Sequence, residues 1–184
     1  LMTGPTHTAH LGWDQRSVQE NAACYYGMVS MVDHYVGRIL EQLDRQGLAE
    51  NTLVVFSSDH GDLLGDHGLF WKGVFPYEEC TRVPMVVRYP GHVPANRSSN
   101  ALQNLVDLHP TLLHYAGLDT APQFEGVNQA PVWENPDHNG VREATVVEDR
   151  PFHSAFNERQ YITDRYKLVV YAHRSYGELY DLLE

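Results

Sequence analysis

The sequence is poor in basic residues and cysteine and contains no long hydrophobic run. Lysine and arginine total 13 against 24 acidic residues, which gives a formal net charge of −11 over 184 residues. A nucleic-acid surface needs clustered Lys and Arg, so that class of partner is excluded. No stretch reaches the roughly 20 apolar residues that span a bilayer. The first residues show no signal-peptide pattern, which leaves the compartment open.

The two cysteines, Cys24 and Cys80, are too few to define a disulfide framework. We interpret them as free and mostly buried thiols, with a single disulfide between them as the alternative. Neither lies in a C-x-x-C motif or in the context of a catalytic cysteine.

Apolar residues recur at steps of three and four between residues 22 and 43, which predicts one long amphipathic helix. Ser17 followed by Glu20 fits a capping box at its start. Gly47 is placed to end the helix in the left-handed conformation.

Short apolar runs predict strands at 53–56 and 83–89, and again at 144–147, 160–163 and 166–171. The first run suits a strand covered on both faces, so we expect a mostly parallel sheet there. Asp107 is predicted to cap a helix that Gly117 ends, with inward-facing apolar residues at Leu108, Leu112, Leu113 and Ala116. The order of elements predicts α/β architecture followed by a small antiparallel sheet.

The candidate functional residues lie in segment 57–73, SSDHGDLLGDHGLFWKG. Asp59 and His60 directly follow a predicted strand, and the carboxyl ends of strands are where open α/β sheets bind ligands. Gly61 would let the backbone turn sharply, so that both side chains face one point. A carboxylate with an imidazole suits Zn²⁺, Mn²⁺ or Fe²⁺, and Ca²⁺ less well. Two ligands do not complete a coordination shell.

Each of these residues also has a purely structural interpretation. Asp59 would cap the turn after the strand, and His60 would be a polar loop histidine. His67 is a candidate to line the site, or else orients the loop. Lys72 by itself would be a surface charge. A self-contained zinc site from Asp59, His60, Asp66 and His67 is a further alternative, in which Lys72 has no role.

Segment 57–73 resembles the second signature region of sulfatases, within the alkaline-phosphatase superfamily. Other segments resemble the family in the same order along the chain: 25–38, 83–91, 106–113 and 177–182. The resemblance covers about residues 22–117 and 144–184. It implies a partial alkaline-phosphatase-like sheet with flanking helices, then a small antiparallel carboxyl-terminal sheet. Residues 1–143 would be the last part of the catalytic domain, and 144–184 a truncated carboxyl-terminal subdomain.

The resemblance implies a metal-dependent sulfuric ester hydrolase. The residues that match Asp59 and His60 bind one divalent metal, and the residue that matches Lys72 contacts the sulfate or an equivalent phosphoryl group. Ca²⁺ is the ion expected from the family, and His60 also admits Mn²⁺ or Zn²⁺. The implied substrate is a sulfate, phosphate or phosphonate ester of a small molecule or glycan. In an acidic chain that repels anions at long range, such local positive charge is needed.

The sequence also departs from the family. It contains no C/S-x-P-x-R motif, the segment in which the formylglycine nucleophile arises, and no paired Asp ligands or Pro-His motif. We therefore expect a fragment that is inactive by itself. A phosphonate monoester hydrolase or phosphodiesterase of the same superfamily is the catalytic alternative, because those enzymes also have His at the position that matches His60. The non-catalytic alternative is a sulfatase-like interaction module, with self-association through an apolar face left bare by truncation.

Overall fold

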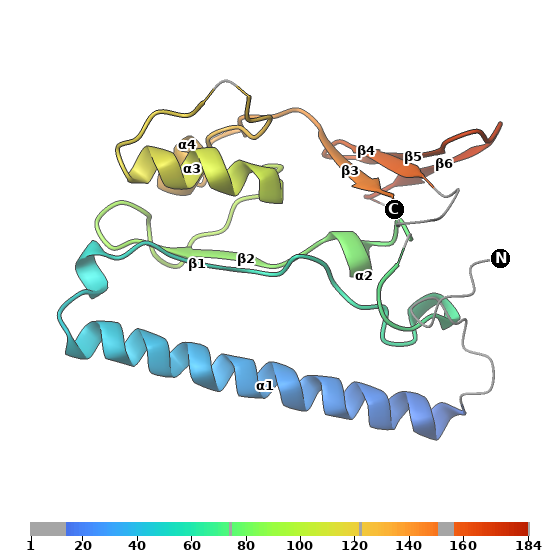
Figure 1. Ribbon diagram of the computed structural model, residues 1–184, viewed down its shortest axis with the longest axis horizontal. Coiled ribbons are helices and arrows are strands. Elements are labelled where there is room, and N and C mark those ends of the chain that lie inside the picture. The colour runs from blue at the N-terminus through green and yellow to red at the C-terminus, as the bar shows by residue number, and fades with distance from the viewer. Residues whose placement is uncertain (1–13, 74, 122, 151–156, 184) are drawn as a thin grey trace. The chain divides into compact units, whose positions relative to one another are not determined.

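The computed structural model describes residues 14–73, 75–121, 123–150 and 157–183. The chain folds as two compact units that divide between Pro90 and Gly91. Figure 1 shows the helices and strands of both units. Among the described helices, none combines the length and apolar character that a membrane crossing requires. The family's catalytic domain is predicted from the sequence to end at residue 143. That domain boundary stays a prediction.

The predicted long helix is α1, Gln15–Arg45, but its amino-terminal cap differs from the prediction. Asp14 Oδ1 accepts hydrogen bonds from Ser17 N at 2.8 Å and Ser17 Oγ at 2.7 Å. The predicted Ser17–Glu20 capping box is therefore wrong, because Ser17 already lies inside the first turn. Glu20 instead accepts from Arg16 Nε at 2.7 Å.

Gly47 ends α1 as predicted, with φ +68°. Gly47 N donates to Asp44 O at 3.0 Å and Leu48 N donates to Leu43 O at 2.9 Å. This pair of bonds is the Schellman motif, which satisfies carbonyls that the helix leaves without partners. The short helix η1, Ala49–Asn51, follows directly.

The apolar side of α1 stays open within the described chain. No residue of the helix is buried. Its exposed large apolar side chains are Tyr26, Met28, Val29, Met31, Val32, Tyr35 and Ile39. Cys24 on this helix is exposed and Cys80 is buried, and both are free thiols. The free-thiol interpretation is confirmed, whereas the expected burial of Cys24 is wrong.

The first unit contains two strands, β1 at Val54–Ser57 and β2 at Met85–Arg88. They pair antiparallel, with Val55 opposite Val87. The expected mostly parallel sheet is wrong for these strands. A parallel pair needs a crossover of a dozen or more residues, usually a helix. Here the connection carries only η2, Asp66–Gly68, and the four-residue α2, Glu78–Thr81, so the chain returns along β1.

The second unit begins with three short helices: η3 at Leu105–Asp107, α3 at Leu108–Tyr115 and α4 at Ala130–Glu134. Gly117 ends α3 with φ +69° and a second Schellman pair, as predicted. The predicted inward face of α3 is wrong at Leu112 and Ala116, which are exposed. Pro110 and Thr111 are the buried residues of this helix.

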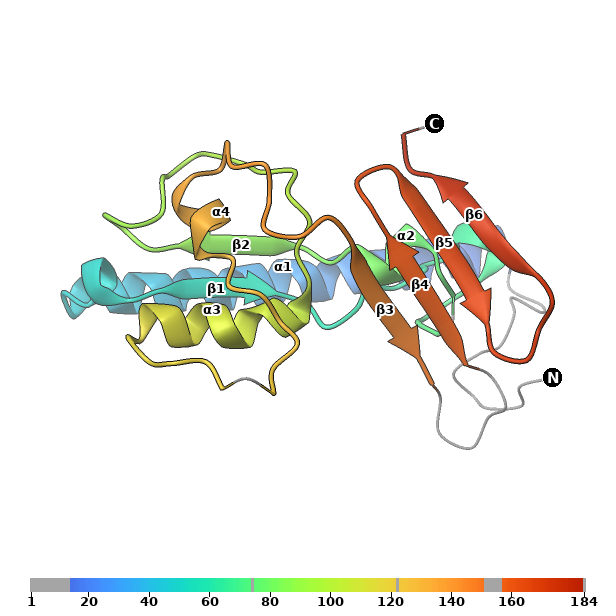
Figure 2. The same cartoon turned by 90° about the horizontal axis from the view of Figure 1, so that it is seen from above.

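The carboxyl-terminal strands form the predicted small antiparallel sheet. The strands are β3 at Thr145–Asp149, β4 at Glu158–Ile162, β5 at Tyr166–Tyr171 and β6 at Gly177–Asp181. They lie in the order β3-β4-β5-β6, a meander that can be followed in Figure 2. One face exposes apolar side chains, namely Val146, Tyr161, Tyr166, Leu168, Val170 and Leu179.

The opposite face of this sheet buries polar side chains. Glu158 and Lys167 are almost completely buried. Glu158 Oε1 accepts from Gln160 Nε2 at 2.7 Å, while its Oε2 accepts no hydrogen bond from the described residues. Burial raises the pKa of Glu158 to about 7, against the hydrogen bond from Gln160. The carboxylates of Asp149 and Glu178 raise this pKa further, and the Lys167 ammonium lowers it.

We expect Glu158→Gln to remove a pH-dependent loss of stability. The pKa of Glu158 is about 7 in the folded chain against an ordinary value of 4.5. Between these pH values the unfolded chain releases the proton first, so wild-type stability falls as pH rises, on the order of 2 kcal/mol in total. Glutamine carries no charge and abolishes this slope. Urea unfolding near pH 5 and near pH 7.5 measures it.

Glu148→Gln on the opposite face is the matched control. Hydrogen bonds from Arg159 and Arg150 hold the pKa of Glu148 below its ordinary value. Its contribution is therefore lost only as pH falls below about 4.5, outside the measured window. Equal pH dependence in wild type and Glu158→Gln would contradict the assignment to Glu158.

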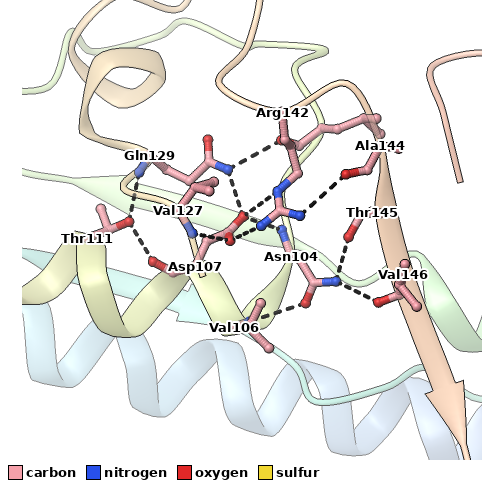
Figure 3. Close-up of polar contacts among 11 residues, drawn as sticks. Asn104, Val106, Asp107, Thr111, Val127, Gln129, Arg142, Ala144, Thr145 and Val146 are labelled. Atoms are coloured by element: carbon pink, nitrogen blue, oxygen red, sulfur yellow. Dashed lines mark hydrogen bonds and ion pairs between the residues drawn. The ribbon is translucent and has the colours of Figure 1, made fainter. Parts of the chain in front are cut away.

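The interior of the second unit is organised around the buried carboxylate of Asp107, shown in Figure 3. It accepts hydrogen bonds from Val127 N at 2.9 Å, Gln129 Nε2 at 2.7 Å and Asn104 N at 3.0 Å. Arg142 adds a bond from Nε at 3.1 Å and one from Nη2. Asp107 therefore occupies the N-cap position of α3 as predicted, but its side chain makes no capping bond to that helix and instead joins three segments of the second unit.

Candidate active site

The loop after β1 is compact although it has little regular structure. Gly61 N donates to Cys80 O at 2.9 Å, and Leu63 N donates to Trp71 O at 2.9 Å. Leu63 is fully buried, and Phe70 nearly so. The two apolar side chains and these bonds close the loop on itself, so that residues 59–60 and 72 have defined positions.

Gly61 is required by close packing rather than by a special backbone angle. A β-carbon at this position would lie 1.8 Å from Glu79 O. The φ of Gly61 lies outside the left-handed region, so the predicted reason for this glycine is wrong. The backbone beside His60 thus rests directly on the backbone of α2, which removes freedom from the neighbouring side chains.

Three residues of the loop adopt the left-handed conformation without being glycine. They are Leu64 at φ 48°, His67 at φ 54° and Trp71 at φ 66°. Such conformations cost roughly 1–3 kcal/mol each and persist only where the surroundings impose them. All three lie between the candidate metal ligands and the candidate lysine.

The loop brings Asp59, His60 and Lys72 together. His60 Nδ1 donates to Gly61 O at 2.9 Å, which places the ring proton on Nδ1 and leaves the Nε2 lone pair as an acceptor. Lys72 Nζ donates to this Nε2 at 2.6 Å. Asp59 Oδ2 lies 3.5 Å from the same Nε2. Three groups predicted from sequence therefore meet at one imidazole nitrogen.

The Asp59 side chain is 83% exposed, and its neighbours hold it in its charged form. Desolvation is the largest single influence and would raise the pKa of Asp59. The opposing influences of His60, the backbone N–H groups of residues 59 and 60, and the Lys72 ammonium outweigh it, so the pKa is lowered overall. His60 N donates to Asp59 Oδ1 at 3.0 Å. Asp59 is thus an ionised carboxylate at neutral pH.

The donor atoms of Asp59 and His60 fit two positions of one metal shell. Ligands each about 2.1 Å from a common ion lie roughly 3–3.5 Å apart, and Asp59 Oδ2 and His60 Nε2 are separated by 3.5 Å. A metal-binding histidine commonly donates its other ring N–H to a carbonyl, as His60 does to Gly61. The residues present therefore fit a divalent ion, as part of its shell.

The alternative of a self-contained zinc site is wrong. Among the described residues, which include 59–73, no group of three or more His, Cys, Asp or Glu side chains is arranged to hold a metal. Asp66 is exposed, and His67 has other contacts. An ion held by Asp59 and His60 would therefore need further ligands from elsewhere in the protein.

His67 packs against the segment that includes α2. Its ring stacks on Tyr77, with centroids 3.7 Å apart and planes at 11°. Its Nε2 lies 3.5 Å from Glu79 Oε2. Glu79 is the same residue whose carbonyl lies against Gly61. The sequence offered no signal for Tyr77 or Glu79, because their contacts with the loop depend on how the chain folds back.

Two family models match this chain. The model described as Sulfatase matches residues 3–118, and the model described as N-sulphoglucosamine sulphohydrolase, C-terminal, matches residues 65–184. The chain belongs to the sulfatase family. The two matches together span nearly all of it, including Asp59, His60 and Lys72.

Curated sulfatases are similar over much of the chain. An N-acetylglucosamine-6-O-sulfatase of Bacteroides thetaiotaomicron is 41% identical over 111 residues, which cover 60% of this chain and 20% of that protein. An ulvan-active sulfatase of Formosa agariphila is 35% identical over 162 residues, or 86% of this chain and 32% of that protein. The chain thus spans about a third or less of these relatives.

Solved structures agree with the fold. A putative sulfatase from Bacteroides thetaiotaomicron has a TM-score of 0.85 at 26% identity, over 95% of this chain and 38% of that one. A structure in complex with its substrate D-glucosamine-2-N,6-O-disulfate has a TM-score of 0.77 at 34% identity, over 84% and 32%. The phosphonate monoester hydrolase of Agrobacterium radiobacter reaches 0.82 at 31% identity, over 94% and 37%. The sulfatase chain therefore has the expected alkaline-phosphatase-like architecture with its small antiparallel sheet.

Proposed function

We propose that this chain supplies two metal ligands and the anion-binding lysine of a metal-dependent sulfuric ester hydrolase. The observation that carries the proposal is the meeting of Asp59 Oδ2 and Lys72 Nζ at the Nε2 atom of His60. An anionic ester bound here would contact a cation on each side. The nucleophile and the remaining ligands would come from sequence outside these 184 residues, since the relatives are about three times longer or more.

The roles of the residues follow from their chemistry. Asp59 and His60 would hold one divalent ion, with Ca²⁺ expected from the family and Mn²⁺ or Zn²⁺ admitted by the imidazole. Such an ion polarises ester oxygens in displacement at sulfur or phosphorus. His60 keeps its proton on Nδ1 through Gly61 O, which presents Nε2 as a ligand. Lys72 offsets the negative charge that develops as the leaving group departs.

His67 would act as a positioning residue in this arrangement. Its stack on Tyr77 and its approach to Glu79 join the turn before Lys72 to the backbone on which Gly61 rests. A group placed in this way controls the separation of Lys72 from His60 without touching the ester. This favours the orienting role for His67 over direct lining of the site.

The proposed substrate is a sulfate ester of an amino sugar or glycan. The support is that the similar proteins include an N-acetylglucosamine-6-O-sulfatase, an ulvan-active sulfatase and a structure with a disulfated glucosamine. A phosphonate monoester hydrolase is the second candidate, favoured by the 31% identity to such an enzyme and by the imidazole of His60.

An interaction module is the non-catalytic candidate. The observation in its favour is the exposed apolar side of α1, together with the exposed apolar face of the β3–β6 sheet. In the catalytic proposal the same surfaces pack against the rest of the protein. Sedimentation of the 184-residue chain therefore measures whether it self-associates, but does not decide whether the protein is an enzyme.

We expect the protein joined to its upstream coding sequence to hydrolyse 4-nitrophenyl sulfate, with activity lost on metal removal and restored by Ca²⁺ or Mn²⁺. Asp59→Asn should remove most of this activity, because an amide is a weaker ligand than a carboxylate. Asp66→Asn, which neutralises an exposed carboxylate of the same loop, is the control and should change little. The 184-residue chain alone should be inactive.

Three outcomes would change this proposal. Turnover by the 184-residue chain alone would contradict a divided active site. Full activity of Asp59→Asn would contradict the ligand assignment. Faster hydrolysis of 4-nitrophenyl phenylphosphonate than of the sulfate would select the second catalytic candidate.

A further inference from the structure

Lys72 is one of only two lysines in this chain, the other being Lys167. Its ammonium lies on the side of His60 that faces Asp59, with Nζ 2.6 Å from Nε2. Lys72 therefore places a positive charge at the atom of His60 that fits a divalent ion.

This contact has a consequence for His60. The Nδ1 atom is committed as a donor to Gly61 O, so the ring has a single remaining lone pair, on Nε2. One lone pair either accepts a hydrogen bond from an ammonium or binds a metal ion, and not both at once. The imidazole cannot flip to offer a second acceptor without losing its bond to Gly61.

We propose that the Lys72 ammonium and the divalent ion compete for His60 Nε2, so that binding of the ion releases Lys72 toward the anionic ester. This inference rests on the proposed function, which places the ion at Asp59 and His60. Before the ion binds, Lys72 occupies the lone pair of His60 that the ion needs.

The competition couples the ion to the substrate. An anion that pairs with Lys72 draws the ammonium away from His60 and exposes the lone pair, which strengthens binding of the ion. By thermodynamic linkage the ion strengthens binding of the anion by the same factor. Each ligand therefore favours a site that contains both, and the bare chain binds each of them more weakly than its charges alone would predict.

Selective ¹³C labelling of the lysine ε-carbons tests this directly, because only two signals arise. We expect Ca²⁺, a diamagnetic probe, to move the Lys72 signal to the position it has in His60→Ala without any ion. The Lys167 signal is the internal control and should stay in place, since that side chain is buried in the second unit. A Lys72 signal that is identical in wild type and His60→Ala without the ion would overturn the contact.

Affinity for Mn²⁺ gives the second measurement, by titration of the protein joined to its upstream coding sequence. Lys72→Met removes the competitor and should tighten Mn²⁺ binding roughly three- to tenfold. Arg82→Met removes an exposed positive charge from the same unit without opening the lone pair, and should change affinity less than twofold. Unchanged or weaker binding in Lys72→Met, or no binding in either protein, would overturn the competition.

His60→Ala separates the two proposals. If this variant binds Mn²⁺ as well as wild type does, the ion lies elsewhere and the proposed function fails. If it loses Mn²⁺ while Lys72→Met gains nothing, the metal site stands and the competition fails.

Discussion

Replacement of Arg142 by methionine is expected to lower the free energy of unfolding by about 3–5 kcal/mol, the usual cost of leaving one partner of a buried ion pair behind. The Asp107 side chain is 1% exposed and that of Arg142 15% exposed. Methionine fills much of the volume but donates no hydrogen bond, so the Asp107 charge keeps only its neutral donors. Three of these, on Val127, Gln129 and Asn104, moderate the loss without replacing the cation.

The second unit also contains a matched exposed pair. Arg97 Nη2 donates to both carboxylate oxygens of Asp137 at 2.6 Å, with side chains 48% and 75% exposed. Arg97→Met should cost no more than about 1 kcal/mol, because water screens the pair. Urea unfolding of both variants measures the difference. Losses within 1 kcal/mol of each other would show that Asp107 does not depend on Arg142.

Lys72→Met is expected to lower kcat/KM of the intact hydrolase by about 10²- to 10³-fold, or roughly 3–4 kcal/mol of barrier. The reason is that methionine retains most of the length of lysine but supplies no charge to the departing oxygen. The effect should fall mainly on kcat, since the leaving-group charge is largest in the transition state. It should also be larger for sulfate esters with poorer leaving groups.

Steady-state kinetics with a series of aryl sulfates checks this expectation, and Arg82→Met serves as the charge-matched control. A loss confined to KM would mean that Lys72 binds the ester equally in the ground and transition states. Activity within about threefold of wild type would remove Lys72 from the site. The lysine variant separates activity from metal affinity, because we expect tighter Mn²⁺ binding and slower hydrolysis in the same protein.

The predictions from sequence held best where one segment determines its own structure. The long helix α1 and its left-handed end at Gly47 follow from local periodicity and from a glycine at the required position. The four strands of the last sheet were recognisable from short apolar runs and from the resemblance at 177–182. The candidate ligand pair Asp59–His60 was recognisable because the two residues are adjacent in the sequence.

The predictions failed where a local pattern has two solutions. A short apolar run is compatible with a parallel or an antiparallel partner, and only the return of the chain after α2 selects the second for β1. Asp107 occupies the predicted N-cap position of α3, yet its carboxylate accepts from Arg142 rather than from the first turn of that helix. Leu112 fits an inward helical position, but α3 packs through Pro110 and Thr111 instead.

The sequence by itself therefore determined the family, the order of the elements and the types of residue at the site. Only the tertiary structure decided that Lys72, twelve positions from His60, donates to its Nε2, and that Arg142, thirty-five positions from Asp107, neutralises it. It also decided that Gly61 faces the carbonyl of Glu79. The physical reason is that such contacts depend on how loops close and on which side chains exclude water together, and no local pattern records either.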